Sequence, residues 1–191
     1  MDRRELLKMI AFATGGVLIG GSSLLTGCAR PGTYTKPIGI FKPEDQEFLD
    51  EVADTILPAT KTPGAKSANV GSFMALMVTD CYEEINRKIF YDGIGLLNTA
   101  SEKVNGVTFM KATPEQRNNL LVKLDQEARA HQQKMKEQQE LPAHYFTMMK
   151  QLTLFGYFSS EIGCTQALRY TPVPGRYSGS VPYKKGDKAW A

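Results

Sequence analysis

Apolar residues recur every three to four positions through most of the chain beyond residue 42, which is the period of an amphipathic α-helix. The first such stretch covers residues 43–57 and opens on Pro43, a residue suited to the first position of a helix. Pro58 ends the stretch, and Pro63-Gly64 marks a turn in the loop that follows. The pattern predicts a helix whose buried face is formed by Phe48, Leu49, Val52, Ala53, Ile56 and Leu57.

The same spacing predicts two helices in the next part of the chain. The second helix is expected from about Val70 to Phe90, and the third ends near Val104. Gly93 and Gly95 interrupt the pattern around residues 91–95, and glycine disfavours a helix interior, so the break between the two helices is expected there. The buried face of the second helix is expected to carry Val70, Phe73, Met74, Met77, Cys81 and Ile85.

The fourth helix has the strongest local signal in the chain. Thr113 caps it, Pro114 takes its first position, and Gln116 completes a capping box. This helix becomes very polar towards residue 140, where a solvated end is expected, and Leu141-Pro142 breaks it. A fifth helix is predicted from about Ala143 to Ile162, with Gly163 as its terminator.

Residues 170–191 differ in kind, because proline and glycine are too frequent there for a regular helix. Their aromatic content argues against simple disorder. The chain is therefore predicted to be all-α: a single compact domain of about five helices over residues 43–169, with an extended arm over residues 170–191. Packing of the arm on this domain and contact with a partner both remain open, and its aromatic residues are Tyr170, Tyr177, Tyr183 and Trp190.

Residues 9–29 carry no charge, and Arg3 and Arg4 stand ahead of them. Together with Leu6-Leu7-Lys8 they resemble a twin-arginine (Tat) export signal, whose machinery typically moves folded cargo. Gly15, Gly16, Gly20 and Gly21 make the uncharged stretch only mildly apolar, which agrees with this interpretation. The alternative is an N-terminal anchor that stays on the protein.

Leu25-Thr26-Gly27-Cys28 resembles a lipobox, at which bacterial lipoproteins are cut and their new N-terminal cysteine is acylated. Residues 1–27 are then the Tat signal, and residues 28–42 are the lipidated N-terminus and a tether. The chain is expected to be a membrane-anchored lipoprotein on the periplasmic side of the envelope. An ordinary signal with a chance cysteine is the alternative.

Composition removes several classes of protein. Hydrophobic residues make up 42% and charged residues 23%, which is ordinary globular usage. The net charge is only +3, so nothing argues for a nucleic-acid partner. No second stretch of the sequence is long and apolar enough to span a bilayer.

The inventory of catalytic and metal-binding groups is small. The two histidines, His131 and His144, lie on either side of Pro142 with no fixed helical geometry, and His131 is expected to be solvated. No dinucleotide fingerprint, haem-attachment motif or zinc spacing is present, so this chain is expected to hold no cofactor or metal. Cys81 and Cys164 allow a disulfide and equally allow two free thiols. The carboxylates Asp54, Asp80, Glu83, Glu84 and Glu161 are expected to lie on solvated helix faces.

Three segments together resemble the gluconate 2-dehydrogenase subunit 3 family. The first is Ala53-Asp54-Thr55-Ile56-Leu57-Pro58-Ala59-Thr60, followed by Thr62-Pro63-Gly64-Ala65. The second is Leu152-Thr153-Leu154-Phe155-Gly156-Tyr157-Phe158-Ser159-Ser160-Glu161-Ile162-Gly163. The third is Pro174-Gly175-Arg176-Tyr177-Ser178-Gly179, then Pro182. Each segment alone is weak, and their order makes the resemblance fairly specific.

The resemblance implies a non-catalytic accessory role. Such proteins are the small subunit of membrane-associated sugar or polyol dehydrogenases whose large, glucose–methanol–choline-type subunit carries FAD. A cytochrome c subunit with haem c often accepts the electrons. The small subunit's Tat signal is thought to export the large subunit. The aromatic residues that could contact a partner are Tyr157, Phe158, Tyr170, Tyr177, Tyr183 and Trp190.

Two other functions compete with the accessory role. Cys28 and the aromatic arm also fit a free-standing envelope lipoprotein that binds a ligand or a partner. An enzyme that uses a carboxylate such as Glu161 is the third candidate.

Overall fold

The computed structural model describes residues 34, 36–137, 141–173, 175–176 and 178–191. Residues 34–191 form a compact unit of their own. Its five longer helices are α2 (Pro43–Ile56), α3 (Val70–Cys81), α4 (Glu84–Asn105), α5 (Pro114–Glu137) and α6 (Tyr145–Ser159). The described residues contain no strand beyond isolated bridges, which confirms the all-α prediction.

Three short helical turns connect or extend these helices. The 3₁₀ turns are η3 (Ala65–Ala68), before α3, and η4 (Phe109–Lys111), before α5. A π-helical turn, η5 (Gly163–Ala167), follows α6. No helix in the described part of the chain is long and apolar enough to cross a membrane.

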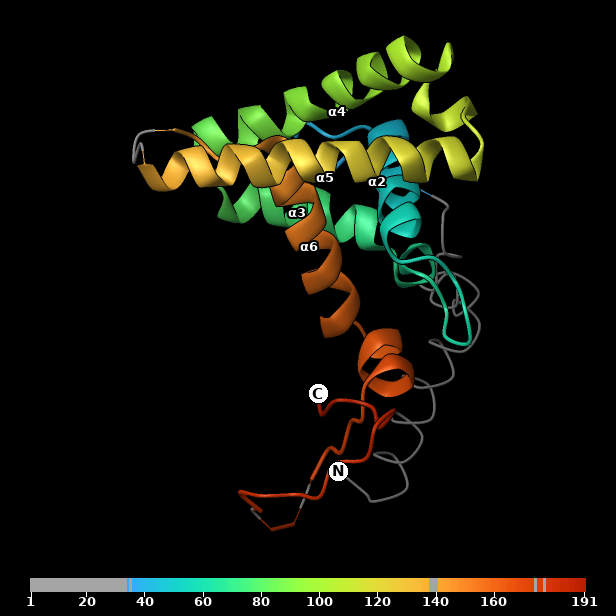
Figure 1. Cartoon of the computed structure of the whole chain (residues 1–191), viewed down its shortest axis with the longest axis vertical. Helices are drawn as coiled ribbons and strands as arrows, with labels where there is room; N and C mark the ends of the chain where they lie inside the picture. The colour runs from blue at the N-terminus through green and yellow to red at the C-terminus, as the bar shows by residue number, and fades with distance from the viewer. Residues whose placement is uncertain (1–33, 35, 138–140, 174, 177) are drawn as a thin grey trace, which may run out of the picture. The chain divides into compact units, whose positions relative to one another are not determined.

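Helix α6 lies at the centre of the packing, because it contacts α2, α3, α4 and α5. Figure 1 shows it crossing the direction of α5, while α4 and α5 run side by side. The core is built from the apolar faces of all five helices. Its largest fully buried side chains include Phe41, Leu49, Met74, Phe90, Leu97, Phe109, Phe146 and Met149.

Three helices begin where the sequence predicts. Helix α2 begins at Pro43, α3 at Val70 and α5 at Pro114. The capping box of α5 is confirmed: the backbone N–H of Thr113 donates to Gln116 Oε1 at 2.9 Å, and the N–H of Gln116 donates to Thr113 Oγ1 at 3.3 Å. These interactions span three residues, so the local sequence suffices to specify them.

The predicted break between the second and third helices is wrong. Helix α3 ends at Cys81, residues 82 and 83 are extended, and α4 then continues through both Gly93 and Gly95. A Cβ atom on Gly93 would lie 2.7 Å from the Tyr145 side chain, so this glycine lets α4 approach α6. The buried face predicted for the second helix is also wrong at its C-terminal end: Cys81 is exposed, and Ile85, which lies on α4, is 61% exposed.

Helix α6 is shorter than the predicted helix over residues 143–162. His144 caps its start, because the imidazole Nδ1 accepts a hydrogen bond from the backbone N–H of Phe146 at 3.2 Å. Ser160 takes an extended conformation and ends it. Its side chain then accepts from the N–H of Gly163 at 3.0 Å, which leads the chain into η5.

Candidate functional site

A buried polar network joins α2 to the start of α3. Gln46, Asp50 and Asp54 follow each other at intervals of four, so they share one face of α2. Asp50 is fully buried and accepts a hydrogen bond from the N–H of Gly71 at 2.6 Å. The Tyr34 hydroxyl also donates to Asp50. The residue before α3 is Asn69, whose side chain makes no capping bond, so Asp50 supplies the cap from a neighbouring helix.

The environment of Asp50 disfavours its charged form. Burial raises the pKa of its carboxyl from 3.8 to about 6, although the hydrogen bond from Gly71 and the charge of Lys66 act in the opposite direction. Gly71 is needed for this approach, because a Cβ there would lie 2.3 Å from the carbonyl oxygen of Gln46. Asp50 is thus a buried carboxylate held between two helices and the segment that carries Tyr34.

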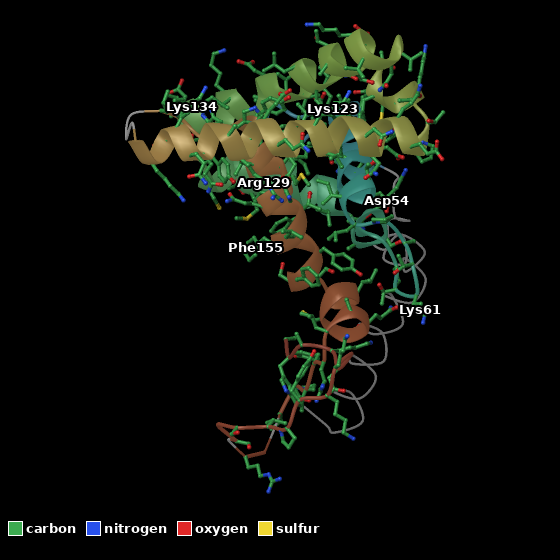
Figure 2. The ribbon with its side chains drawn as sticks, in the orientation of Figure 1. Asp54, Lys61, Lys123, Arg129, Lys134 and Phe155 are labelled. Carbon is green, nitrogen blue, oxygen red and sulfur yellow. The ribbon has the colours of Figure 1, made fainter. Side chains whose placement is uncertain are left out.

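The next turn of α2 holds the loop after it. Asp54 Oδ1 accepts from the N–H of Lys66 at 3.3 Å, and a Cβ on Gly64 would lie 2.4 Å from the same oxygen. Glu51 forms an ion pair with Lys66 at 2.7 Å and another with Arg117 of α5. Burial alone would raise the pKa of Glu51, but these two cations outweigh it and lower that pKa. The loop is therefore fixed by charged contacts from α2, the helix on which Figure 2 labels Asp54.

Tyr157 connects this loop to α6. Its hydroxyl donates to the carbonyl oxygen of Pro63 at 2.7 Å, and the residue is only 4% exposed. The expectation that Tyr157 presents an aromatic surface to a partner is therefore wrong, because its ring is part of the core. The contact brings together two segments that carry the family resemblance, 62–65 and 152–163.

An apolar strip on α6 and α3 remains exposed. We use "the α6 strip" for Leu154, Phe155 and Phe158 of α6 together with Phe73 of α3. Phe155 is 56% exposed, Leu154 and Phe158 are each 38% exposed, and the Phe155 and Phe73 rings lie 5.5 Å apart. Phe73 fits over Gly156, where a Cβ would lie 2.6 Å from its ring. Figure 2 shows Phe155 on α6, directed away from the neighbouring ribbon. Contiguous exposed aromatic surface of this kind is typical of sites that bind another protein.

The C-terminal arm closes on its own base. The N–H of Arg169 donates to the carbonyl oxygen of Ala189 at 2.7 Å, and the N–H of Ala191 donates back to the oxygen of Arg169 at 3.2 Å. The Arg169 guanidinium lies over the Trp190 ring at 4.5 Å. Tyr170, Tyr183 and Trp190 are each more than half exposed. Tyr177, the remaining predicted contact residue of the arm, lies outside the described residues.

The two histidines meet, which the sequence did not predict. Their rings lie 5.6 Å apart in a hollow of about 330 Å³ between α5 and α6, and His144 stacks on Tyr145. His131 Nε2 lies 2.8 Å from the carbonyl oxygen of Pro142, so this nitrogen donates. His144 Nδ1 accepts, which requires its unprotonated state there; burial and then the charge of His131 lower its pKa accordingly. The described residues hold no group of three or more His, Cys, Asp or Glu side chains that could ligate a metal.

The remaining predicted site residues are spread over the chain. Cys81 and Cys164 are both free thiols, the first exposed and the second half-buried. Asp80, Glu83, Glu84 and Glu161 are exposed as expected, and Asp54 is half-buried. Arg3, Arg4 and Cys28 lie outside the described residues.

The chain is an all-α domain whose buried polar groups hold helix ends and loops, and whose exposed aromatic residues lie on α6 and on the arm. A comparison with known protein families shows which family this domain belongs to. The family model described as gluconate 2-dehydrogenase subunit 3 matches residues 43–175, so the chain belongs to that family. The comparisons with curated proteins and with solved structures found no match. The family is one of dehydrogenase accessory subunits.

Proposed function

We propose that this chain is the non-catalytic small subunit of an exported sugar or polyol dehydrogenase. Its partner is a large subunit of the glucose–methanol–choline type, which carries FAD and the active site. A cytochrome c subunit with haem c is the proposed electron acceptor. The family assignment over residues 43–175 carries the proposal. The α6 strip supports it, because it offers a partner an exposed aromatic surface on a helix that the core holds rigidly.

The large subunit is the first thing to test. The chain is purified from its native host under mild conditions, and a larger flavoprotein with bound FAD is expected with it. Deletion of this chain should leave that flavoprotein in the cytoplasm or unstable. If the dehydrogenase is exported normally without this chain, and the chain purifies alone, the accessory role is wrong.

The α6 strip gives a sharper test with a matched control. Phe155→Asp places a charge in the strip, whereas Ile85→Asp makes the same kind of change at a 61% exposed position of α4 outside it. Truncation of a central aromatic contact costs about 2 kcal/mol or more, which is roughly a thirtyfold loss of affinity. Phe155→Asp should release the flavoprotein, and Ile85→Asp should retain it. Equal retention by both variants would place the docking surface elsewhere.

Export and anchoring are proposed to depend on the N-terminal residues. Replacing Arg3 and Arg4 together with lysine keeps the positive charge and removes the arginine pair that the Tat machinery reads. This double variant should stay in the cytoplasm together with the flavoprotein. Envelope localisation unchanged by the double substitution would rule out a Tat signal.

Cys28 is proposed to carry the lipid that attaches the complex to the membrane. Cys28→Ala should abolish the lipid mass and shift the chain, with its flavoprotein, from the membrane to the soluble fraction. An unchanged intact mass and membrane fraction in Cys28→Ala would refute lipidation at this residue.

A further inference from the structure

The C-terminal arm differs in charge from the helices that precede it. Residues 34–169 contain 15 basic and 17 acidic residues, a net charge of −2. Residues 170–191 contain four basic residues and one acidic residue, a net charge of +3. Segregation of positive charge into a terminal segment points to an anionic binding surface.

The cations of the arm are available to such a surface. Its single carboxylate, Asp187, accepts from the N–H of Lys184 at 3.0 Å in a turn and lies 3.9 Å from the Arg169 guanidinium. Among the described residues, Arg176, Lys184 and Lys185 form no ion pair, and all three are exposed. The positive charge is therefore not neutralised within the arm.

Exposed apolar and aromatic side chains alternate with these cations. Val173 is 82% exposed, Tyr183 is 75% exposed, and Trp190 is 55% exposed. Lys184 and Lys185 follow Tyr183 directly. Trp and Tyr beside Lys and Arg are the side chains that favour the boundary between lipid headgroups and acyl chains.

The arm is also held in a defined loop. The backbone pairing of Arg169 with Ala189 and Ala191 closes it, and the Arg169–Trp190 contact packs its base. An open hollow of about 740 Å³ lies within the loop, and Val173, Arg176, Val181 and Trp190 are among the residues that line it. A preformed loop loses less conformational entropy on binding than a free tail does.

We propose that residues 170–191 bind the surface of an anionic lipid bilayer, as a second membrane contact in addition to any lipid on Cys28. The exposed cations and the exposed apolar side chains of the arm match an anionic bilayer, which presents negative headgroups above an apolar interior. Basic residues beside apolar ones strengthen attachment to an anionic bilayer, whether or not a lipid also anchors the chain. The arm would thereby hold the domain close to the bilayer.

Trp190 is the only tryptophan of the chain, so its fluorescence reports on the arm alone. The test uses the chain from residue 28 onward with Cys28→Ser, so that no acyl chain contributes to binding. Vesicles of phosphatidylcholine with phosphatidylglycerol in equal amounts should shift the Trp190 emission to shorter wavelength and bind the chain in sedimentation. Vesicles of pure phosphatidylcholine should do neither, and raising the salt concentration should release the chain.

The contribution of Lys184 and Lys185 to vesicle binding is tested against a matched pair of lysines elsewhere in the chain. Each cation near an anionic surface contributes about fivefold in affinity, so Lys184→Gln with Lys185→Gln should weaken binding about 25-fold. Lys134→Gln with Lys136→Gln removes the same charge from two exposed positions at the end of α5 and should leave binding unchanged. Equal weakening by both pairs, or no emission shift with anionic vesicles, would overturn the proposal. Loss of the flavoprotein from the purified complex in the Lys184→Gln, Lys185→Gln variant, with no vesicle binding by the wild type, would also overturn it and would make the arm a protein-docking element.

Discussion

Removal of the buried charge at Asp50 should stabilise the folded protein at neutral pH. Asp50→Asn keeps an oxygen that can accept from the N–H of Gly71 and a second polar atom opposite the Tyr34 hydroxyl. The variant therefore mimics the protonated carboxyl at nearly unchanged volume. What it removes is the free-energy penalty of holding an ionised carboxylate in a fully buried position.

The magnitude follows from the shift in pKa. A carboxyl with a pKa of 3.8 in the unfolded chain and about 6 in the folded protein holds its proton more tightly when folded. Its contribution to the free energy of unfolding is therefore largest at low pH and is lost as the pH rises from about 4 through about 6. By this linkage, the wild type should be less stable than Asp50→Asn by about 3 kcal/mol at pH 7.5 and by about 1 kcal/mol at pH 4.5. The larger difference corresponds to a rise in Tm of about 6–12 °C.

Urea unfolding followed by circular dichroism, at both pH values, measures this difference. All other titrating groups are shared by the two proteins, so their effects cancel in the comparison. Asp50→Ala serves as the control: it also removes the charge but leaves the Gly71 N–H and the Tyr34 hydroxyl without their partner, so it should be less stable than Asp50→Asn by about 1–3 kcal/mol at both pH values. A less stable Asp50→Asn at pH 7.5, or a difference independent of pH, would show that the ionised carboxylate is not penalised by its burial.

Four further substitutions test the packing of the helices. Gly93→Ala should lower the free energy of unfolding by about 1–3 kcal/mol, because the added methyl group meets Tyr145. Gly95→Ala in the same helix has nothing within 4 Å of the added methyl group and should raise the free energy of unfolding by about 0.5–1 kcal/mol. Thermal unfolding of both variants separates the effect of crowding from that of helix propensity. Tyr157→Phe should cost about 1 kcal/mol through the lost bond to Pro63, and increased protease cleavage in the loop after α2 would identify the site of loosening. Arg117→Met should lower the free energy of unfolding in urea by about 3 kcal/mol, because Arg117 pairs with Glu51 and also donates to the carbonyl oxygens of Phe109 and Met110. An unchanged unfolding midpoint would show that Lys66 alone is enough to stabilise the half-buried charge of Glu51.

Local signals in the sequence predict the helices where neighbouring residues form them. The capping box at Thr113 and the proline at the start of α2 belong to this kind, and both helices begin where expected. The helix break predicted around Gly93 and Gly95 is wrong because its outcome depends on residues far away in the sequence. Whether a glycine interrupts a helix or permits close packing depends on the facing residue, and Tyr145 reaches Gly93 from another helix. The helical period places Gly93 on the buried face of α4 with Phe90 and Leu97, and Gly95 on the exposed face, but α4 alone does not show which residue packs against Gly93.

The buried polar network could be predicted from the sequence only in part. The spacing of Gln46, Asp50 and Asp54 shows that they share a helix face, but polar residues on one face ordinarily indicate solvent. Their burial depends on Gly71, where the absence of a side chain lets the start of α3 reach Asp50. The meeting of His131 and His144 likewise depends on the angle between α5 and α6, which their positions along the chain do not specify.

The residues that carry the family resemblance mainly make contacts within the domain. They therefore show which family the chain belongs to, and they do not show which partner it binds. Asp54 holds the loop through Lys66, Pro63 accepts from Tyr157, and a Cβ on Gly163 would lie 1.9 Å from the carbonyl oxygen of Tyr157. Such contacts specify how three parts of the domain fit together: α6, η5 and the loop that follows α2. They do so whatever the domain binds. A partner can only contact what remains outside, and the exposed large apolar residues of the second motif are Leu154, Phe155 and Phe158. The same stretch of α6 therefore stabilises the fold with one face and offers an aromatic surface with the other, so a substitution on the inner face tests stability while one at Phe155 tests the complex.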